Sequence, residues 1–141
     1  MLSPFAVHIP LGAMSTKVAK YQQKQLDQKR QLPHPVYAAM IEHCDDMVGR
    51  LIDAVEDNGL TDNTMIIFTS DNGGLSSAEG SPTSNLPFRG GKGWIYEGGI
   101  RVPFMVRWPN VGKTDYTNPA AVTGLDIFPT IMEIAGADKS N

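Results

Sequence analysis

The sequence predicts an α/β fold, because an amphipathic helix leads directly into an apolar strand. Apolar residues recur at three- and four-residue spacing over residues 35–57, the period of a helix with one buried face. Residues 65–68 form an unbroken apolar run, which is typical of a strand covered on both faces. Helix followed by buried strand is half of a parallel α/β layer. We therefore expect residues 64–70 to form a central buried strand with the helix packed on it.

The segments before this helix are predicted from turn residues and polarity. Residues 5–9 have the composition of a strand end, closed by Pro10 and Gly12. Residues 17–30 are polar and rich in Gln and Lys, which indicates a solvated helix or a loop. Residues 32–35 should interrupt any helix, because a residue that precedes proline avoids helical angles.

The helix should end at Asn58-Gly59, since both residues tolerate the left-handed conformation of a C-cap. Residues 71–101 hold most of the 14 glycines and form either a disordered segment or a functional loop system. Residues 102–108 are a second predicted strand, with Pro103 at its start or on an edge. A final helix is expected to begin between residues 126 and 128 and to be capped by Gly136.

Composition limits the class of protein. A chain of 141 residues suits one domain. Its formal charge of −3 argues against nucleic acid or an anionic membrane as the main partner, and no apolar run reaches the ~18 residues of a membrane span. With Cys44 as the single cysteine, no intrachain disulfide can form. The chain begins within an expected element and without a leader, which indicates a truncated domain.

Asp71 and Asn72 are the candidate metal ligands. They follow the predicted strand at its carboxyl end, where open α/β sheets place their ligand sites, and Gly73-Gly74 lets the chain turn there. A carboxylate beside a carboxamide oxygen offers hard donors that suit Ca²⁺ or Mg²⁺. Each of these residues also favours turns, so a plain turn remains the alternative.

Lys92 and His8 are the other candidates. Glycines on both sides of Lys92 allow close approach of the backbone to a phosphate or sulfate, although the motif taken by itself favours a flexible loop with a solvated lysine. The spacing matches neither a P-loop nor a dinucleotide fingerprint. His8 lies just past a predicted strand end, and a lone histidine is usually structural or solvated.

Together these stretches resemble the type I, arylsulfatase-like sulfatases of the alkaline phosphatase superfamily. Each motif alone is common, but their order and spacing match the family over nearly the whole chain, in a style closest to bacterial enzymes that act on glycans. The matching segments are, in order, residues 8–10, 37–41, 46–51, 59–64, 67–74, 89–93, 96–103 and 126–130.

The resemblance implies a fold and roles for four residues. The fold would be part of a sulfatase/alkaline-phosphatase-like sandwich, with a mainly parallel central sheet flanked by helices. Asp71 and Asn72 match a pair of calcium ligands, Lys92 matches a lysine that binds the sulfate group, and His8 matches a histidine on the leaving-group side. Ca²⁺ is therefore the expected metal.

The chain departs from the family at the nucleophile. The family uses a formylglycine made from a Cys/Ser-x-Pro-x-Arg motif, which is absent here; residues 85–89 imitate its spacing, but Asn85 cannot become an aldehyde. The family's N-terminal Asp-Asp calcium pair is also absent. We therefore expect residues 1–141 to be the C-terminal part of a truncated sulfatase catalytic domain, inactive on its own.

The expected function of the parent enzyme is hydrolysis of sulfate esters, on a sulfated small molecule or glycan. A phosphodiesterase or phosphonate hydrolase of the same superfamily is the second interpretation, because sulfate and phosphate esters differ mainly in charge. A non-catalytic remnant that binds anions or a partner is the third. The chain does not reveal its localisation; the family suggests a periplasmic, extracellular or lysosomal protein.

Overall fold

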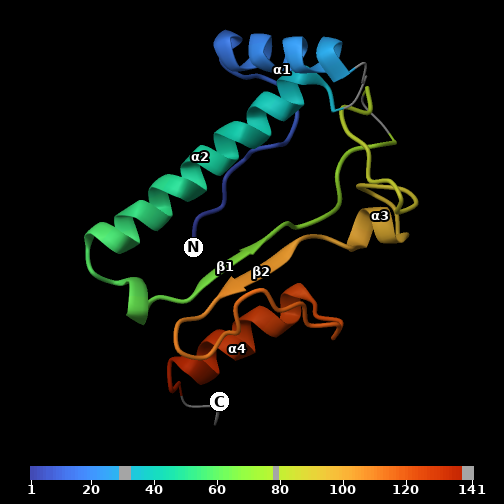
Figure 1. The fold of residues 1–141 in the computed structure, drawn as a ribbon. Helices are drawn as coiled ribbons and strands as arrows, with labels where there is room; N and C mark the ends of the chain where they lie inside the picture. Colours follow the sequence, from blue (N-terminus) through green and yellow to red (C-terminus); the bar gives the residue numbers. More distant parts are fainter. Residues whose placement is uncertain (29–32, 78–79, 138–141) are drawn as a thin grey trace. The chain divides into compact units, whose positions relative to one another are not determined.

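The computed structural model describes residues 1–28, 33–77 and 80–137 (Figure 1). The chain divides into two units, Met1–Asn110 and Val111–Asn141, and each is described by itself. Within the described residues no helix combines the length and the apolar character needed to cross a membrane.

The longest element is α2, Pro35–Asp57, and it confirms the helix predicted from periodicity. Pro35 occupies the first helical turn, where its missing N–H costs nothing, and the ring of His34 accepts the Val36 N–H at 3.3 Å. At the other end the Asn58 side chain donates to the Ala54 carbonyl oxygen at 2.7 Å. Gly59 then takes a φ of 65°, so the predicted Asn58-Gly59 stop is confirmed.

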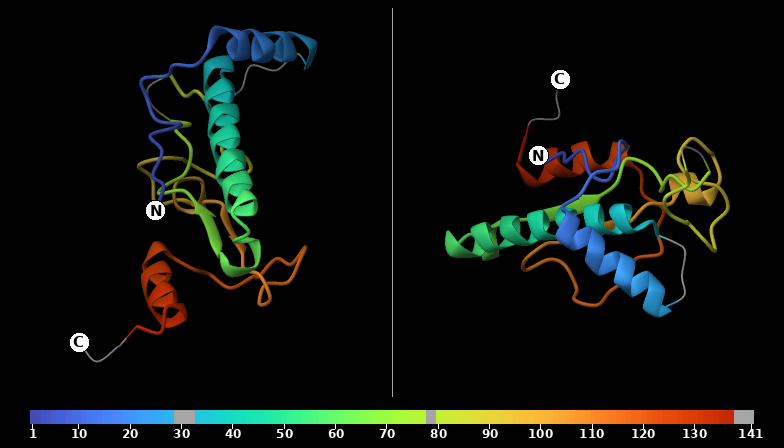
Figure 2. Two further views of the ribbon diagram at one scale, coloured as in Figure 1. Left: turned by 90° about the vertical axis from the view of Figure 1, so that its left-hand side faces the viewer. Right: turned by 90° about the horizontal axis from the view of Figure 1, so that it is seen from above.

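The polar stretch before it is a helix, α1, Ser15–Gln28. Residues 29–30 of the predicted stretch and residue 32 of the predicted break lie outside the described residues. Figures 1 and 2 show α1 lying across the N-terminal half of α2.

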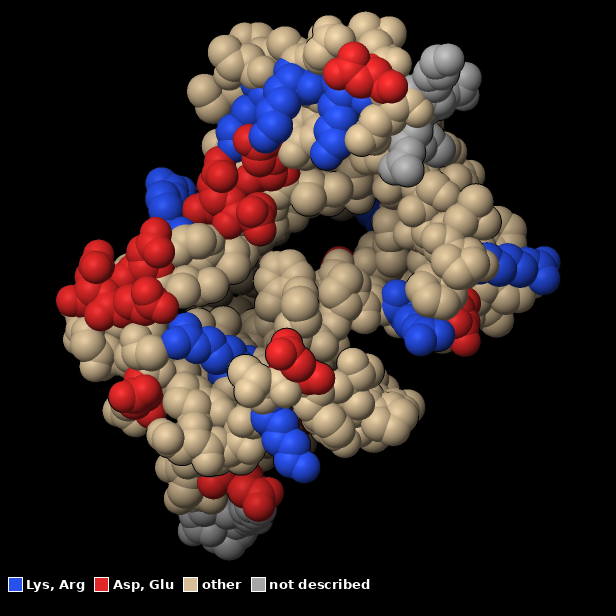
Figure 3. Space-filling model, in the orientation of Figure 1, with Lys and Arg blue, Asp and Glu red and all other residues tan. Residues whose placement is uncertain are grey.

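Ion pairs join these two helices. No residue of α1 is buried. Lys17 pairs with Asp46 and lies 3.3 Å from Glu42, and Lys20 lies 2.8 Å from Glu42. Figure 3 shows basic and acidic side chains side by side where α1 meets α2. The pKa of the Glu42 carboxyl is lowered from 4.5 to about 2, mainly by its hydrogen bond with the Lys20 ammonium. The Tyr21 hydroxyl and Lys17 lower it further.

The sheet differs from the prediction. It consists of β1, Ile66–Thr69, and β2, Phe104–Arg107, and the two strands pair antiparallel with Ile66 opposite Arg107. The prediction of a mainly parallel sheet is therefore wrong for these strands. An apolar run indicates that both faces of a strand are to be buried, but it does not determine whether the neighbouring strand is parallel or antiparallel.

The predicted burial of residues 64–70 on both faces is also wrong within the described chain. Ile66 and Ile67 are half-buried and Phe68 is 36% exposed. All four residues of β2 are exposed as well. Each strand has one described neighbour, and two short strands cannot cover both faces of their own sheet.

Two further boundaries differ from expectation. Residues 5–9 form a turn in place of a strand end, with the His8 N–H donating to the Phe5 carbonyl oxygen at 3.0 Å. The strand expected over residues 102–108 is limited to β2, and Pro103 immediately precedes it, as its missing N–H predicts.

The buried apolar residues of the described chain lie together in the first turns of α2: Tyr37, Ala38, Ala39 and Met40. The rest of the apolar stripe of this helix is half-buried or exposed; Ile41 and Leu51 are 46% and 43% exposed. The core within the described part of the chain is therefore small, and ion pairs and backbone contacts carry much of its order.

In the second unit a 3₁₀ turn, Gly124–Asp126, leads into α4, Ile127–Ile134. The Thr123 N–H donates to the Asp126 carboxylate at 2.6 Å, and the Leu125 N–H donates to the Thr123 hydroxyl, which together form a capping box. Gly136 follows with a φ of 64°. The predicted final helix and its Gly136 cap are confirmed.

The Glu42 cluster predicts an acid-sensitive contact between the helices. Because the folded chain lowers the pKa of Glu42, the stabilisation is complete above about pH 4.5 and is lost as the pH falls toward about 2. Isolated helices as short as α1 are marginal in water, so helicity should fall over that window. We expect Glu42→Gln to lower helicity at neutral pH and to flatten the acid transition, measured by far-UV circular dichroism.

Glu56→Gln is the matched control, because it makes the same charge change on α2, where Glu56 lies 3.8 Å from Arg107. It should leave the acid transition unchanged. An equal acid-induced loss of helicity in the Glu42→Gln variant and the unsubstituted chain would contradict the assignment.

Candidate functional site

His8 and Lys92 are brought into direct contact, although 84 positions separate them in the sequence. Lys92 Nζ lies 2.6 Å from His8 Nε2, and His8 Nδ1 lies 2.8 Å from the Ile9 carbonyl oxygen. A carbonyl oxygen only accepts, so Nδ1 carries a proton. Nε2 then offers its lone pair to the Lys92 ammonium. The pair forms a compact cationic site with a fixed histidine tautomer.

The loop that carries Lys92 is fixed by its backbone. The Lys92 N–H donates to the Gly74 carbonyl oxygen at 3.0 Å, and the Trp94 N–H donates to the Gly91 carbonyl oxygen at 2.9 Å. Gly90 and Gly93 have φ values of 76° and 84°, a conformation that favours glycine. The sequence left open whether Lys92 sits on a flexible loop; within the structure its backbone is hydrogen-bonded to the turn after β1.

Asp71 and Asn72 lie on that turn. The Ser70 hydroxyl donates to the Asn72 carbonyl oxygen at 2.9 Å, and the Asn72 amide donates to the Gly73 carbonyl oxygen at 2.9 Å. Asp71 is exposed, and its carboxylate makes no hydrogen bond or ion pair with the described residues. The backbone bends at both residues, and the Asp71 carboxylate stays accessible to a ligand.

The structure joins the two halves of the candidate site through the backbone only. Among the described residues no bond links the side chains of Asp71 or Asn72 with those of His8 or Lys92, but the Lys92–Gly74 bond places the loop beside the turn. The described residues contain no group of three or more His, Cys, Asp or Glu that could hold a metal. Asp71 and Asn72 therefore offer two adjacent oxygen donors, which suit Ca²⁺ but are part of the 6–8 that it usually takes.

Asn85 is a residue of this region whose contacts sequence reasoning missed. Its Oδ1 accepts the Gly74 N–H at 3.2 Å, and its Nδ2 lies 2.9 Å from the Gly74 carbonyl oxygen, 2.9 Å from Ser76 Oγ and 3.1 Å from the Gly90 carbonyl oxygen. In the sequence Asn85 was noted only as the residue that replaces a nucleophile. A half-buried Asn within a Gly/Ser-rich loop is the signal that could have indicated a structural hub.

Glycines make this region compact. A Cβ at Gly73 would lie 1.8 Å from the Gly98 carbonyl oxygen, and a Cβ at Gly99 would lie 2.0 Å from the Trp94 carbonyl oxygen. At Gly91 it would lie 2.5 Å from the Gly74 carbonyl oxygen. Glycine is therefore required where these backbone segments cross, and the short helix α3, Glu97–Ile100, packs its two glycines into the crossing.

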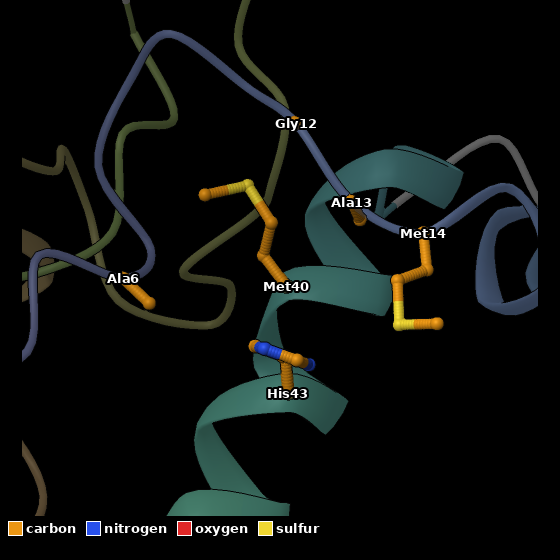
Figure 4. A pocket seen from close by; sticks show the side chains of 6 residues that line it. All are labelled: Ala6, Gly12, Ala13, Met14, Met40 and His43. Atoms are coloured by element: carbon orange, nitrogen blue, oxygen red, sulfur yellow. The ribbon is translucent and has the colours of Figure 1, made fainter.

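A separate pocket of about 380 Å³ lies between the N-terminal segment and α2 (Figure 4). Met40 and His43 come from α2, and the other lining residues come from the N-terminal segment: Ala6, Gly12, Ala13 and Met14. None of the predicted site residues lines it. Its lining is mostly apolar, and His43 is its single titratable side chain.

A family model described as "Sulfatase" matches residues 1–137. The chain is 40% identical to a "Sulfatase" of Formosa agariphila over 96% of this chain and 26% of that protein. It is 34% identical to "Arylsulfatase D" of Homo sapiens over 97% of this chain and 22% of that protein. The chain thus spans about a quarter of the length of these relatives.

Among solved structures, the chain is similar to Ps i-CgsB, crystallised in complex with k-i-k-neocarrahexaose. The TM-score is 0.83 at 34% sequence identity, and the match covers 94% of this chain and 28% of that one.

The glycine crossing gives a prediction on stability. Gly99→Ala should lower the free energy of unfolding by about 1–3 kcal/mol, because the new Cβ would overlap backbone that cannot move like a side chain. Gly49→Ala is the control: nothing lies within 4 Å of its Cβ position, and on α2 it should stabilise by about 0.5–1 kcal/mol. Chemical denaturation measures both. Equal effects of the two substitutions would contradict the crowding at Gly99.

Proposed function

Because the chain belongs to the sulfatase family, we propose that it takes part in the hydrolysis of sulfate esters, with His8 and Lys92 in contact with the ester group. The observation that carries this proposal is the 2.6 Å contact between the two side chains. Both residues were assigned to ester binding from sequence resemblance alone. A contact over 84 positions is what a shared site requires.

The chemistry follows from the charges. A sulfate monoester carries one negative charge over its oxygens, and charge builds on the leaving oxygen as the S–O bond breaks. The Lys92 ammonium stabilises the sulfuryl oxygens. Nδ1 is bound to the Ile9 carbonyl oxygen, so Nε2 is the ring atom of His8 that can act on the departing oxygen, once it has taken a proton from the Lys92 ammonium across the 2.6 Å contact. The ammonium has three hydrogens, so it can serve His8 and an ester oxygen together.

Asp71 and Asn72 are proposed as two of the calcium ligands. Their support is the accessible carboxylate, the adjacent carboxamide and the backbone bond from Lys92 to the same turn. Ca²⁺, when bound, neutralises negative charge on the ester oxygens. In this proposal residues 1–141 are the C-terminal part of a sulfatase catalytic domain. The formylglycine nucleophile and the other calcium ligands belong to the rest of that domain.

A sulfated glycan is the proposed substrate class. Its support is the similarity to Ps i-CgsB, whose crystal structure holds an oligosaccharide, k-i-k-neocarrahexaose. Sulfated oligosaccharides are therefore the first substrates to test.

The first test uses the natural full-length protein with a sulfated oligosaccharide and an aryl sulfate. Lys92→Ala should lower turnover about 10²-fold or more, as expected for loss of one preorganised charged contact. Lys24→Ala, an exposed lysine on α1, is the control and should leave turnover unchanged. Faster hydrolysis of the matching phosphate ester would favour the phosphodiesterase or phosphonate hydrolase alternative, and no hydrolysis of either ester would favour a non-catalytic remnant.

The second test addresses the metal. Asp71→Ala should abolish or strongly weaken Ca²⁺ binding to the same protein, because the carboxylate offers charge directly to the cation, and isothermal titration calorimetry measures this. Asp62→Ala, which removes another exposed carboxylate close in sequence, is the control. Unchanged calcium affinity in the Asp71→Ala protein would remove Asp71 from the ligand set.

A further inference from the structure

We propose that Asn85 is the positioning residue of this site: its carboxamide holds the loop that carries Lys92 against the turn that carries Asp71 and Asn72. The identity of the bound ester rests on the proposed function. The positioning role rests on hydrogen bonds that are independent of it.

The carboxamide of Asn85 pairs with Gly74 as a backbone peptide group would. Oδ1 accepts the Gly74 N–H at 3.2 Å, and Nδ2 donates to the Gly74 carbonyl oxygen at 2.9 Å. Two antiparallel residues exchange the same two bonds across a ladder. The pairing therefore fixes the direction of the backbone two residues after Asn72.

The same carboxamide reaches the lysine loop. Nδ2 also lies 3.1 Å from the Gly90 carbonyl oxygen, two residues before Lys92. The Gly74 carbonyl oxygen, which accepts from Asn85, also accepts the Lys92 N–H at 3.0 Å. A carbonyl oxygen has two lone pairs, so both bonds can form together. Asn85 thus lies at the junction of the two segments that carry the proposed ligands.

Among the described residues, no other side chain makes a hydrogen bond to both Gly74 and Gly90. A Cβ at Gly91 would lie 2.7 Å from Asn85 Nδ2 and 2.4 Å from Ser76 Oγ, so the space is already filled. The Ser76 hydroxyl donates to the Gly90 carbonyl oxygen at 3.0 Å but makes no bond to Gly74. Removal of the carboxamide would leave the part-buried Gly74 N–H without a partner, which is costly for a group shielded from water.

The consequence falls on Lys92. A lysine side chain is a flexible four-carbon stem, so the position of its ammonium depends on where the backbone places the residue. With the loop in place, Nζ reaches His8 Nε2 at 2.6 Å. Without Asn85, we expect the loop to lose its register on the turn and the ammonium to leave His8.

The test follows the His8 ring in the natural full-length protein by ¹H–¹⁵N NMR at mildly alkaline pH. In the unsubstituted chain we expect protonated Nδ1 and a hydrogen-bonded, unprotonated Nε2. Lys92→Ala supplies the reference spectrum for the lost contact. Asn85→Asp is isosteric and keeps the acceptor, but it turns a carboxylate oxygen toward acceptors at Gly74, Ser76 and Gly90. Asn85→Asp and Asn85→Ala should both move the His8 signals to the Lys92→Ala reference.

Inorganic sulfate gives a second readout. Titration of sulfate should shift the His8 signals of the unsubstituted chain at concentrations about tenfold lower than those of the Asn85 variants, the ratio expected when one or two hydrogen bonds hold the site together. Asn58→Ala is the matched control, because its carboxamide also bonds to backbone, 2.7 Å from the Ala54 carbonyl oxygen at the end of α2. It should leave both readouts unchanged.

Three results would overturn the proposal. The first is a His8 spectrum that does not change in the Asn85 variants, and the second is an unsubstituted chain without the hydrogen-bonded Nε2. The third is loss of α2 helicity in the Asn85 variants, measured by circular dichroism, because Asn85 would then act on folding as a whole. Absence of sulfate ester turnover would overturn the proposed function and leave the His8 spectrum as it is, so the two failures are distinguishable.

Discussion

The carbonyl oxygen of Gly74 is the atom on which the candidate site depends. It accepts the Lys92 N–H and the Asn85 amide, and so it joins the turn after β1 to the glycine-rich loop. Such close approach is possible only because glycines line the crossing. A side chain at Gly91 would lie 2.5 Å from that oxygen. The conformational cost of so many glycines is offset by backbone contacts that no other residue type would permit.

Order in the first unit therefore comes from polar and backbone contacts more than from a large apolar core. The buried apolar residues are confined to the first turns of α2. The ion pairs of Glu42 join α1 to α2. The residues of β1 and β2 are half-buried or exposed. The chain spans about a quarter of the length of its sulfatase relatives. Local hydrogen bonding of this kind does not need a complete domain core to define a loop.

The electrostatics of the site agree with an anionic ligand. His8 is held as one tautomer by the Ile9 carbonyl oxygen, and Lys92 brings a positive charge to its other nitrogen. The nearby turn carries Asp71, which suits a cation and not an anion. A cationic side chain beside a turn that is proposed to hold Ca²⁺ would suit the sulfate ester of the proposed function.

The sequence by itself determined the features that depend on neighbouring residues. The period of apolar positions and the Asn58-Gly59 stop located α2, and the final helix with Gly136 was located in the same way, because helix hydrogen bonds and caps lie within a few residues of one another. Motif order identified the family.

Only the tertiary structure decided the antiparallel pairing of β1 with β2, the turn in place of a strand at residues 5–9, and the His8–Lys92 contact. The same holds for the hydrogen bonds of Asn85 to Gly74, Ser76 and Gly90. Strand direction and long-range side-chain contacts depend on segments far apart in the chain, so the local sequence pattern does not determine them.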